Sequence, residues 1–184
     1  MKKILPIIIV GILILSGLGI TASSTEEKNI SEKASFVFSR PILKEENDFA
    51  TLELKEANGF LMEKNKPMLP SYTQTFTYPA GTNIESVKCI AKNIQKLQIS
   101  KQIKPTPVAI PVSALSMITS EKASYSLEES YPETWYQYDI GSGIVDNERS
   151  IILKIEILPV KYNPMEESIE WADEVEIEIE YNLD

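Results

Sequence analysis

Residues 173–181, "DEVEIEIEY", alternate between acidic and apolar side chains from Glu174 onward. Successive residues of a β-strand point to opposite faces of a sheet, so a period of two predicts a strand with one buried face. Val175, Ile177, Ile179 and Tyr181 are expected to face inward. The stretch therefore predicts a sheet built around this strand.

The segment that precedes this strand is expected to be its partner. "SIILKIEILPVKY" (150–162) is rich in β-branched residues, and the turn-rich "NPMEES" (163–168) separates it from 169–181. Two strand-like runs joined by a short turn favour a hairpin. We therefore expect residues 150–162 and 169–181 to pair along their length.

The rest of the chain consists of short runs of similar type between turn residues, and no run favours a helix. Many short strands without long crossover helices predict an all-β fold, an antiparallel β-sandwich of jelly-roll or Ig-like type. The other expected strands are 35–40, 49–55, 71–78, 83–91, 96–103, 107–112, 123–129 and 134–140.

Prolines punctuate the stretch "NKPMLPSYTQTFTYPAG" (65–81). A proline has no backbone N–H and a fixed φ, so Pro67, Pro70 and Pro79 are expected at strand edges and ends. Gly81 is expected to permit the turn into the next strand.

The N-terminus resembles an export signal. A basic start at Lys2 and Lys3 precedes an apolar run (4–20), and Thr21-Ala22 offers a small-residue cleavage site. We expect residues 1–22 to be a signal peptide, 23–34 a flexible leader and 35–184 the β-sandwich. The alternative is an uncleaved signal anchor, in which case the protein would contact a membrane.

Composition excludes several classes of function. The 184 residues include no histidine, which excludes His-dependent triads, His-ligated zinc and His-based acid–base catalysis. Without residues 1–22 the chain has 16 basic and 27 acidic side chains, a net charge of −11. Such a surface repels nucleic acid and anionic lipid. We expect no catalytic residue, no metal ligand, no cofactor and no nucleic-acid partner.

Cys89 is the single cysteine, so no intramolecular disulfide can form. The alternation in "NIESVKCIAK" places Val87, Cys89 and Ala91 on one face, where a cysteine behaves as a small hydrophobic residue. We expect a buried structural cysteine. The alternative is an intermolecular or reactive thiol, for which the sequence offers no activating base.

Two clusters of side chains allow a binding function. Three carboxylates aligned on one strand face, Glu176, Glu178 and Glu180, would suit Ca²⁺ if loop oxygens converged there, but a solvated acidic face is the favoured interpretation. Four aromatic residues could stack on a sugar ring. Adjacent strand residues such as Trp135 and Tyr136 point to opposite faces, however, so we expect the aromatic residues of one face to fill the core. These aromatic residues are Trp135, Tyr136, Tyr138 and Trp171.

The order of the proline, glycine and aromatic signals is similar to that of a known family. Asn65-Lys66-Pro67-Met68-Leu69-Pro70 matches a Gly-x-Pro-x-Leu-Pro element, with asparagine at the position that requires a positive φ. The chain resembles the propeptide domain of gingipain-type (family C25) cysteine peptidases over most of residues 36–184. The matching motif residues are Pro67, Leu69, Pro70, Pro79, Gly81, Pro105, Pro107, Pro159, Tyr162, Asn163 and Pro164.

The resemblance implies a non-catalytic prodomain of a secreted peptidase. Such a domain helps its peptidase fold and keeps it latent by covering the active-site cleft. The implied partner is the cognate C25-type catalytic domain. The chain stops at Asp184, before any catalytic domain, so we expect a free-standing prodomain or a piece of a longer precursor.

The resemblance also implies that a basic side chain enters the specificity pocket of the peptidase. Arg149, in the expected loop "GSGIVDNERS", is the first candidate, and Lys66 and Lys104 are the next. Other basic residues in connectors are Arg40, Lys64 and Lys101. Two other functions use the same fold and export signal: a carbohydrate-binding or adhesion module, and a structural repeat of a surface layer.

Overall fold

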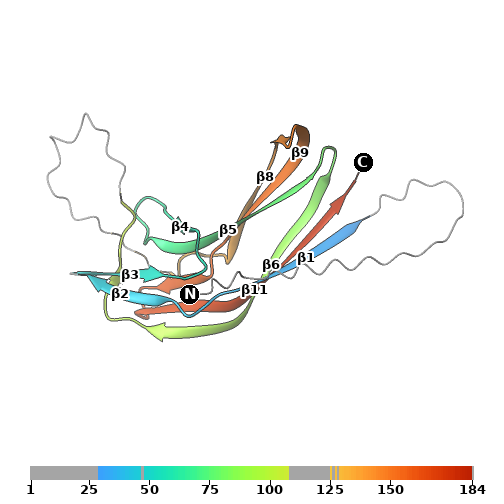
Figure 1. Ribbon diagram of the computed structural model, residues 1–184. Coiled ribbons are helices and arrows are strands. Elements are labelled where there is room, and N and C mark those ends of the chain that lie inside the picture. Colours follow the sequence, from blue (N-terminus) through green and yellow to red (C-terminus); the bar gives the residue numbers. More distant parts are fainter. Residues whose placement is uncertain (1–28, 47, 108–124, 126, 128, 184) are drawn as a thin grey trace, which may run out of the picture.

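The computed structural model describes residues 29–46, 48–107, 125, 127 and 129–183. Eleven strands form in this part of the chain, with no helix among them, so the predicted all-β class is confirmed (Figure 1). Among these residues, no helix is long and apolar enough to span a membrane. The predicted signal peptide, all but the first residue of the strand expected at 107–112 and most of the one expected at 123–129 lie outside the described residues.

The first sheet is organised around the long strand β11 (Ser168–Asn182). Strand β6 (Asn83–Gln98) pairs with it antiparallel along one side. On the other side, β10 (Val160–Asn163) pairs with its beginning and β1 (Ile30–Val37) with the remainder. Strand β11 is therefore central in this sheet.

The second sheet has the strand order β4-β5-β9-β8. Its members are β4 (Gly59–Leu61), β5 (Leu69–Pro79), β9 (Glu148–Ile157) and β8 (Tyr136–Val145). All three pairings are antiparallel, and the two large sheets pack face to face as the predicted sandwich.

A small third sheet lies at one end of the sandwich. It contains β2 (Ile42–Glu46), β3 (Phe49–Glu53) and β7 (Gln102–Ile103), and β7 runs parallel to β3. Figure 1 shows β2 and β3 at the end opposite to that reached by β8 and β9.

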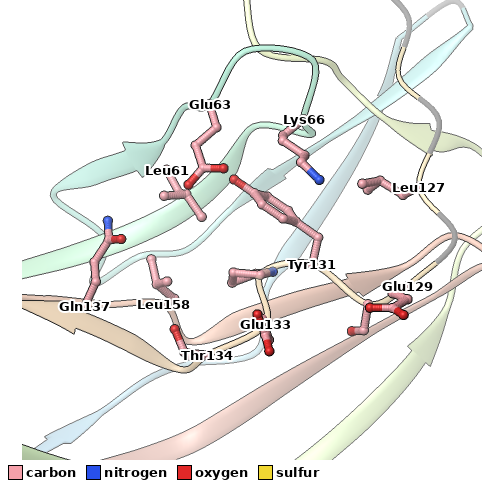
Figure 2. A pocket seen from close by; sticks show the side chains of 12 residues that line it. Leu61, Glu63, Lys66, Leu127, Glu129, Tyr131, Glu133, Thr134, Gln137 and Leu158 are labelled. Carbon is pink, nitrogen blue, oxygen red and sulfur yellow. The ribbon is translucent and has the colours of Figure 1, made fainter.

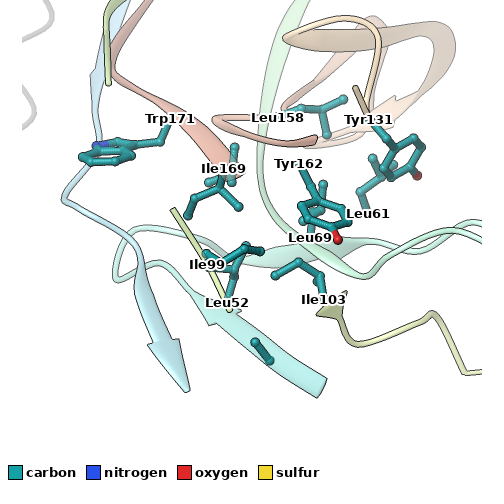
Figure 3. Packing of buried hydrophobic residues seen from close by; sticks show 12 residues of the cluster. Leu52, Leu61, Leu69, Ile99, Ile103, Tyr131, Leu158, Tyr162, Ile169 and Trp171 are labelled. Carbon is teal, nitrogen blue, oxygen red and sulfur yellow. The ribbon is translucent and has the colours of Figure 1, made fainter. Parts of the chain in front are cut away.

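Two hydrophobic clusters hold these layers together. The sandwich core contains Leu153 and Ile155 of β9 opposite Val175 and Ile177 of β11, each at most 1 % exposed. The second cluster joins the small sheet to the sandwich around Tyr162 (Figure 3). Burial of apolar area at both places stabilises the fold.

The predicted alternation of β11 is confirmed. Val175, Ile177 and Ile179 are buried, and Tyr181 is half-buried. The intervening glutamates face the other way, where Glu176, Glu178 and Glu180 pair with Lys92, Lys33 and Lys88 of the flanking strands. The carboxylates are therefore neutralised within the sheet.

The predicted C-terminal hairpin is wrong over most of its length. Only β10 pairs with β11, whereas β9 belongs to the other sheet. The chain changes sheets at Leu158-Pro159: the N–H of Leu158 donates to the carbonyl of Trp135, and the carbonyl of Pro159 accepts from Ala172. Pro159 has no N–H to continue the ladder, which explains why the run breaks there.

The expected leader (23–34) is also corrected in part. Residues 30–34 are not flexible, because they belong to β1 and pair with Ile177–Tyr181 of β11. Pairing with the long central strand gives the backbone of this segment its hydrogen-bond partners. The polar composition of the segment contains no signal of this pairing.

The expected turn conformations at Asn65 and Gly81 are confirmed, with φ of 61° and 89°. We predict that Asn65→Ala lowers the free energy of unfolding by about 1 kcal/mol, because a Cβ-bearing residue without a local hydrogen-bonding group is disfavoured at positive φ. Asn65→Gly is expected to change it by less than about 0.5 kcal/mol. Urea titration of both variants measures this, and equal losses for alanine and glycine would contradict it.

Candidate functional site

The proline motifs of the sequence meet in space beside the second cluster. The N–H of Met68 donates to the carbonyl of Lys104 at 2.9 Å, and the N–H of Thr106 donates to the carbonyl of Lys66 at 2.8 Å. Pro67 lies opposite Pro105 in an isolated bridge between these hydrogen bonds. The segment around Pro67 is thus held by the segment around Pro105.

A second bridge joins Tyr131 to Tyr162. Each N–H donates to the carbonyl of the other residue, at 2.9 Å from Tyr131 and 2.6 Å from Tyr162. The ammonium of Lys66 lies 5.3 Å from the ring centroid of Tyr131, which permits a cation–π contact. The Pro67 motif therefore contacts this pair through Lys66, and the Pro105 motif is joined to the Pro67 motif.

A surface pocket of about 550 Å³ opens over Tyr131. Figure 2 shows the carboxylate of Glu63 and the ammonium of Lys66 on one side and Glu133 on the other. Burial and the nearby Glu63 carboxylate raise the pKa of Tyr131, so its hydroxyl is neutral at physiological pH. The pocket offers charged and polar groups for contact with another molecule.

Arg149 does not lie in a loop, which corrects the sequence prediction. It is the second residue of β9 and pairs with Ile144 of β8, while Gly141-Ser142-Gly143 lie inside β8. The turn contains only Asp146 and Asn147, both with positive φ. The side chain of Arg149 is nevertheless exposed at the tip of this hairpin.

The lysine candidates have different surroundings. Lys66 is half-buried against Tyr131, whereas Lys104 is exposed, and Lys64 is exposed beside the Asn65 turn. Lys101 forms an ion pair with Glu45 at 3.2 Å. Arg40 lies over the ring of Trp171, 5.9 Å from its centroid. The structure brings Lys66 and Lys104 to neighbouring segments, and Arg149 lies on a different element.

Most motif residues occupy structural positions. The buried ones are Pro67, Leu69, Pro70, Pro105, Pro159 and Tyr162. Asn163 caps the turn after β10, where its side-chain oxygen accepts from the N–H of Glu166 at 3.2 Å, and Pro164 follows it. Pro79 ends β5, and Pro107 is exposed.

The aromatic residues do not form a shared platform. Trp171 is buried, and the ring of Trp135 is covered by the ammonium of Lys161 at 4.6 Å. Tyr136 and Tyr138 alone have nearly parallel rings, 6.3 Å apart. This arrangement does not favour the carbohydrate-binding alternative.

The described acidic residues do not support the Ca²⁺ alternative. Among the residues that the structure describes, no group of three or more Asp, Glu or Cys side chains is placed to share a metal ion. Glu176, Glu178 and Glu180 of β11 each form an ion pair with a lysine instead.

Cys89 is half-buried and packs against the sandwich core. Burial raises the pKa of its thiol to about 12. Because the thiolate is the reactive form, we predict that a thiol reagent at pH 8 modifies the folded protein at least about a hundredfold more slowly than the urea-unfolded protein. Equal rates in the two states would show that the thiol is not protected by the fold.

Neither the pocket nor the contact between Lys66 and Tyr131 was predicted from the sequence. Lys66 was part of a recognised motif, but no local pattern relates it to Tyr131, which lies far away in the chain. Their proximity results from tertiary packing, since Tyr131 and Leu69, which is close to Lys66 in the chain, belong to the same hydrophobic cluster.

These features define a β-sandwich domain with a polar pocket at one end. The family model Propeptide_C25 matches residues 28–184, and the chain therefore belongs to this family. No curated protein matches the sequence.

Two solved structures share the fold. One, from a study of the zymogenic latency of gingipain K from Porphyromonas gingivalis, has 17 % identity and a TM-score of 0.65 over 90 % of this chain and 98 % of that one. The other, the complex of the pro- and mature domains of RgpB from the same organism, has 13 % identity and a TM-score of 0.56. That match covers 85 % of this chain and 79 % of the other.

Proposed function

We propose that this protein is a non-catalytic prodomain that binds a C25-type cysteine peptidase, assists its folding and keeps it latent. The observation that carries this proposal is the family match across residues 28–184. The fold supports it, since the likeness covers 98 % of the gingipain K chain, whose structure concerns zymogenic latency.

The partner in this proposal is the catalytic domain of the cognate peptidase. A rigid sandwich suits this role, because a preorganised surface loses little conformational entropy on binding. The complex of pro- and mature domains of RgpB is a precedent in another protein for such an association.

The protein itself contributes no catalysis in this proposal. Its sequence contains no histidine, so a Cys/His pair has to come from the peptidase. Residues 1–22 would act as a signal peptide that directs the protein out of the cell, where a secreted peptidase would meet it.

Arg149 is the proposed specificity-pocket residue, with Lys66 and Lys104 as alternatives. Arg149 is exposed at the tip of the β8–β9 hairpin, which gives its guanidinium access to a partner. A guanidinium presents five donors in a fixed planar arrangement, which suits an acidic specificity pocket. Lys66 suits this role less well, because its ammonium already contacts Tyr131.

The test is a titration of the purified chain into an active C25-type peptidase from the organism that produces this chain. Cleavage of a basic peptide is the readout. We expect saturable inhibition that Arg149→Ala weakens about tenfold or more. Lys154→Ala is the matched control, since Lys154 is an exposed cation on the same strand.

The outcomes separate the function from the residue assignment. No inhibition by the folded chain at micromolar concentration would overturn the prodomain function. Inhibition that is equally sensitive to Arg149→Ala and Lys154→Ala would leave the function intact and overturn the role of Arg149. Lys66→Ala and Lys104→Ala would then identify the residue among the alternatives.

A further inference from the structure

Strand β8 forms one edge of the second sheet. In the described part of the chain it pairs with β9 alone, and its ten residues are exposed or half-exposed. An edge strand carries a row of N–H and C=O groups that can pair with another chain.

The hairpin geometry identifies the outward-facing groups. Val145 pairs with Glu148 across a two-residue turn, and Asp146 and Asn147 have φ of 51° and 67°, as in a type I′ turn. The pair that closes such a turn is hydrogen-bonded, and hydrogen-bonded pairs alternate with open ones along the ladder. The backbone groups directed away from β9 are therefore those of Tyr138, Ile140, Ser142 and Ile144.

The edge strands β1, β2, β4 and β6 have features that discourage pairing with another chain. Strand β6 has Lys88, Lys92 and Lys96 and a positive φ at Asn93, and β1 and β2 also carry lysines. Strand β4 has three residues. Strand β8, "YQYDIGSGIV", contains no lysine, arginine or proline, and Asp139 is its one charged residue. Strand β8 therefore lacks the lysines, prolines and short length with which natural edge strands avoid pairing with another chain.

The side chains of β8 add an uncovered apolar row. Tyr138, Ile140 and Ile144 are 44 %, 48 % and 75 % exposed, although they lie on the same sheet face as the buried Leu153 and Ile155. The first sheet covers only the start of this row, where the hydroxyl of Tyr136 donates to the carbonyl of Val87. Figure 1 shows β8 and β9 diverging from β6 and β11 toward the turn that joins β8 to β9.

Charge distinguishes the possible occupants of this edge. In a full-length antiparallel pairing of two copies, the tip of the β8–β9 hairpin, which carries Asp146, Glu148 and the cation Arg149, would approach Glu133 near the other end of the second copy. Arg149 offsets part of the local repulsion at each end, so the main effect against a second copy is the formal net charge of −9 that each chain carries. A second copy therefore fits poorly, and a segment with basic residues near its ends fits well.

We propose that the β8 edge is a docking site for an extended segment of the C25-type peptidase, which pairs with β8 as an additional strand. The inference rests on the prodomain function proposed above and adds the surface through which binding occurs. Alternate apolar residues of the segment cover Tyr138, Ile140 and Ile144, and its basic residues face Asp146 and Glu148. Main-chain pairing supplies affinity, and the apolar row sets the register.

The test uses two substitutions at the edge. Ser142→Pro removes an outward N–H without removing a hydrogen bond to β9, and Ser142→Thr is the matched control that retains it. Ile140→Lys places an ammonium in the apolar row. In the inhibition titration we expect Ser142→Pro and Ile140→Lys to weaken binding about tenfold or more, and Ser142→Thr to leave it within about twofold.

Hydrogen exchange on the wild-type complex provides an independent measurement. The amides of Ile140, Ser142 and Ile144 are expected to become protected when the peptidase binds, because their N–H groups acquire acceptors. Thermal unfolding of each variant alone, with an unchanged midpoint, shows that the fold is intact. If Ser142→Pro unfolds the domain, Ile140→Lys and the exchange experiment carry the test.

The outcomes distinguish this proposal from the prodomain function. Wild-type inhibition with no loss in Ser142→Pro or Ile140→Lys and unprotected β8 amides would overturn the edge proposal alone. Absence of inhibition by the wild type would overturn both. Concentration-dependent dimerisation of the wild type that Ser142→Pro abolishes would assign the edge to a second copy and overturn the peptidase assignment.

Discussion

Tyr162→Ala is expected to lower the free energy of unfolding by about 4 kcal/mol, the largest effect of any substitution discussed for this protein. Tyr162 is 2 % exposed and is among the largest fully buried side chains. Its ring packs at the centre of the second cluster and meets Tyr125 edge to face, with 6.4 Å between ring centroids. Truncation would leave a cavity where the small sheet joins the sandwich.

Urea unfolding at equilibrium measures this effect. Tyr162→Phe retains the ring and is expected to cost less than about 1.5 kcal/mol, which separates lost volume from the lost hydroxyl. Tyr138→Ala is a second control, because this tyrosine is 44 % exposed. A loss below about 1 kcal/mol for Tyr162→Ala would show that the second cluster does not stabilise the domain.

Ile177→Ala is expected to lower the free energy of unfolding by about 3 kcal/mol. Ile177 is 1 % exposed at the middle of β11, and it packs with Val175, Ile179 and residues of the opposite sheet. Both flanking strands pair with it, through Ala34 and Cys89, so the backbone around the site has little freedom to collapse into the cavity.

Ile90→Ala is the matched control for this substitution. Ile90 lies on the adjacent strand β6, opposite Glu176, and is 54 % exposed. We expect it to cost less than about 1 kcal/mol, because an exposed side chain loses little apolar burial. Similar losses for both isoleucines would contradict the assignment of the two faces of the sheet.

These predictions place the motif residue Tyr162 in the fold rather than in a binding surface. A buried ring cannot reach a partner, so the tyrosine of this motif serves packing rather than binding. The candidates for contact with the peptidase are exposed and lie elsewhere: Arg149 at the hairpin tip, and the backbone edge and apolar row of β8.

Much of the fold was predictable, because local signals agreed with the tertiary structure. The alternation around Ile177 identified a half-buried strand, and the asparagine at position 65 identified a positive φ. The order of proline and glycine signals identified the family. Each of these signals depends on the conformation of a single residue or a single strand.

Strand pairing was less predictable, because it depends on partners that are distant in the chain. The run from 150 to 162 has one apolar pattern, yet the chain changes sheets at Pro159. Residues 30–34 have a polar composition typical of a leader, yet they pair with the central strand. For the same reason Arg149 was expected in a loop, since glycines at 141 and 143 are compatible with a turn as well as with an edge strand.

The sequence alone determined the strand-rich class, the inward and outward faces of β11 and the family. All of these follow from side-chain period, backbone preference or composition. Only the tertiary structure decided that Lys66 meets Tyr131 at a pocket and that β8 is an unprotected edge. A strand becomes an edge only when the whole sheet order is set, and that order is a property of long-range pairing rather than of any local stretch.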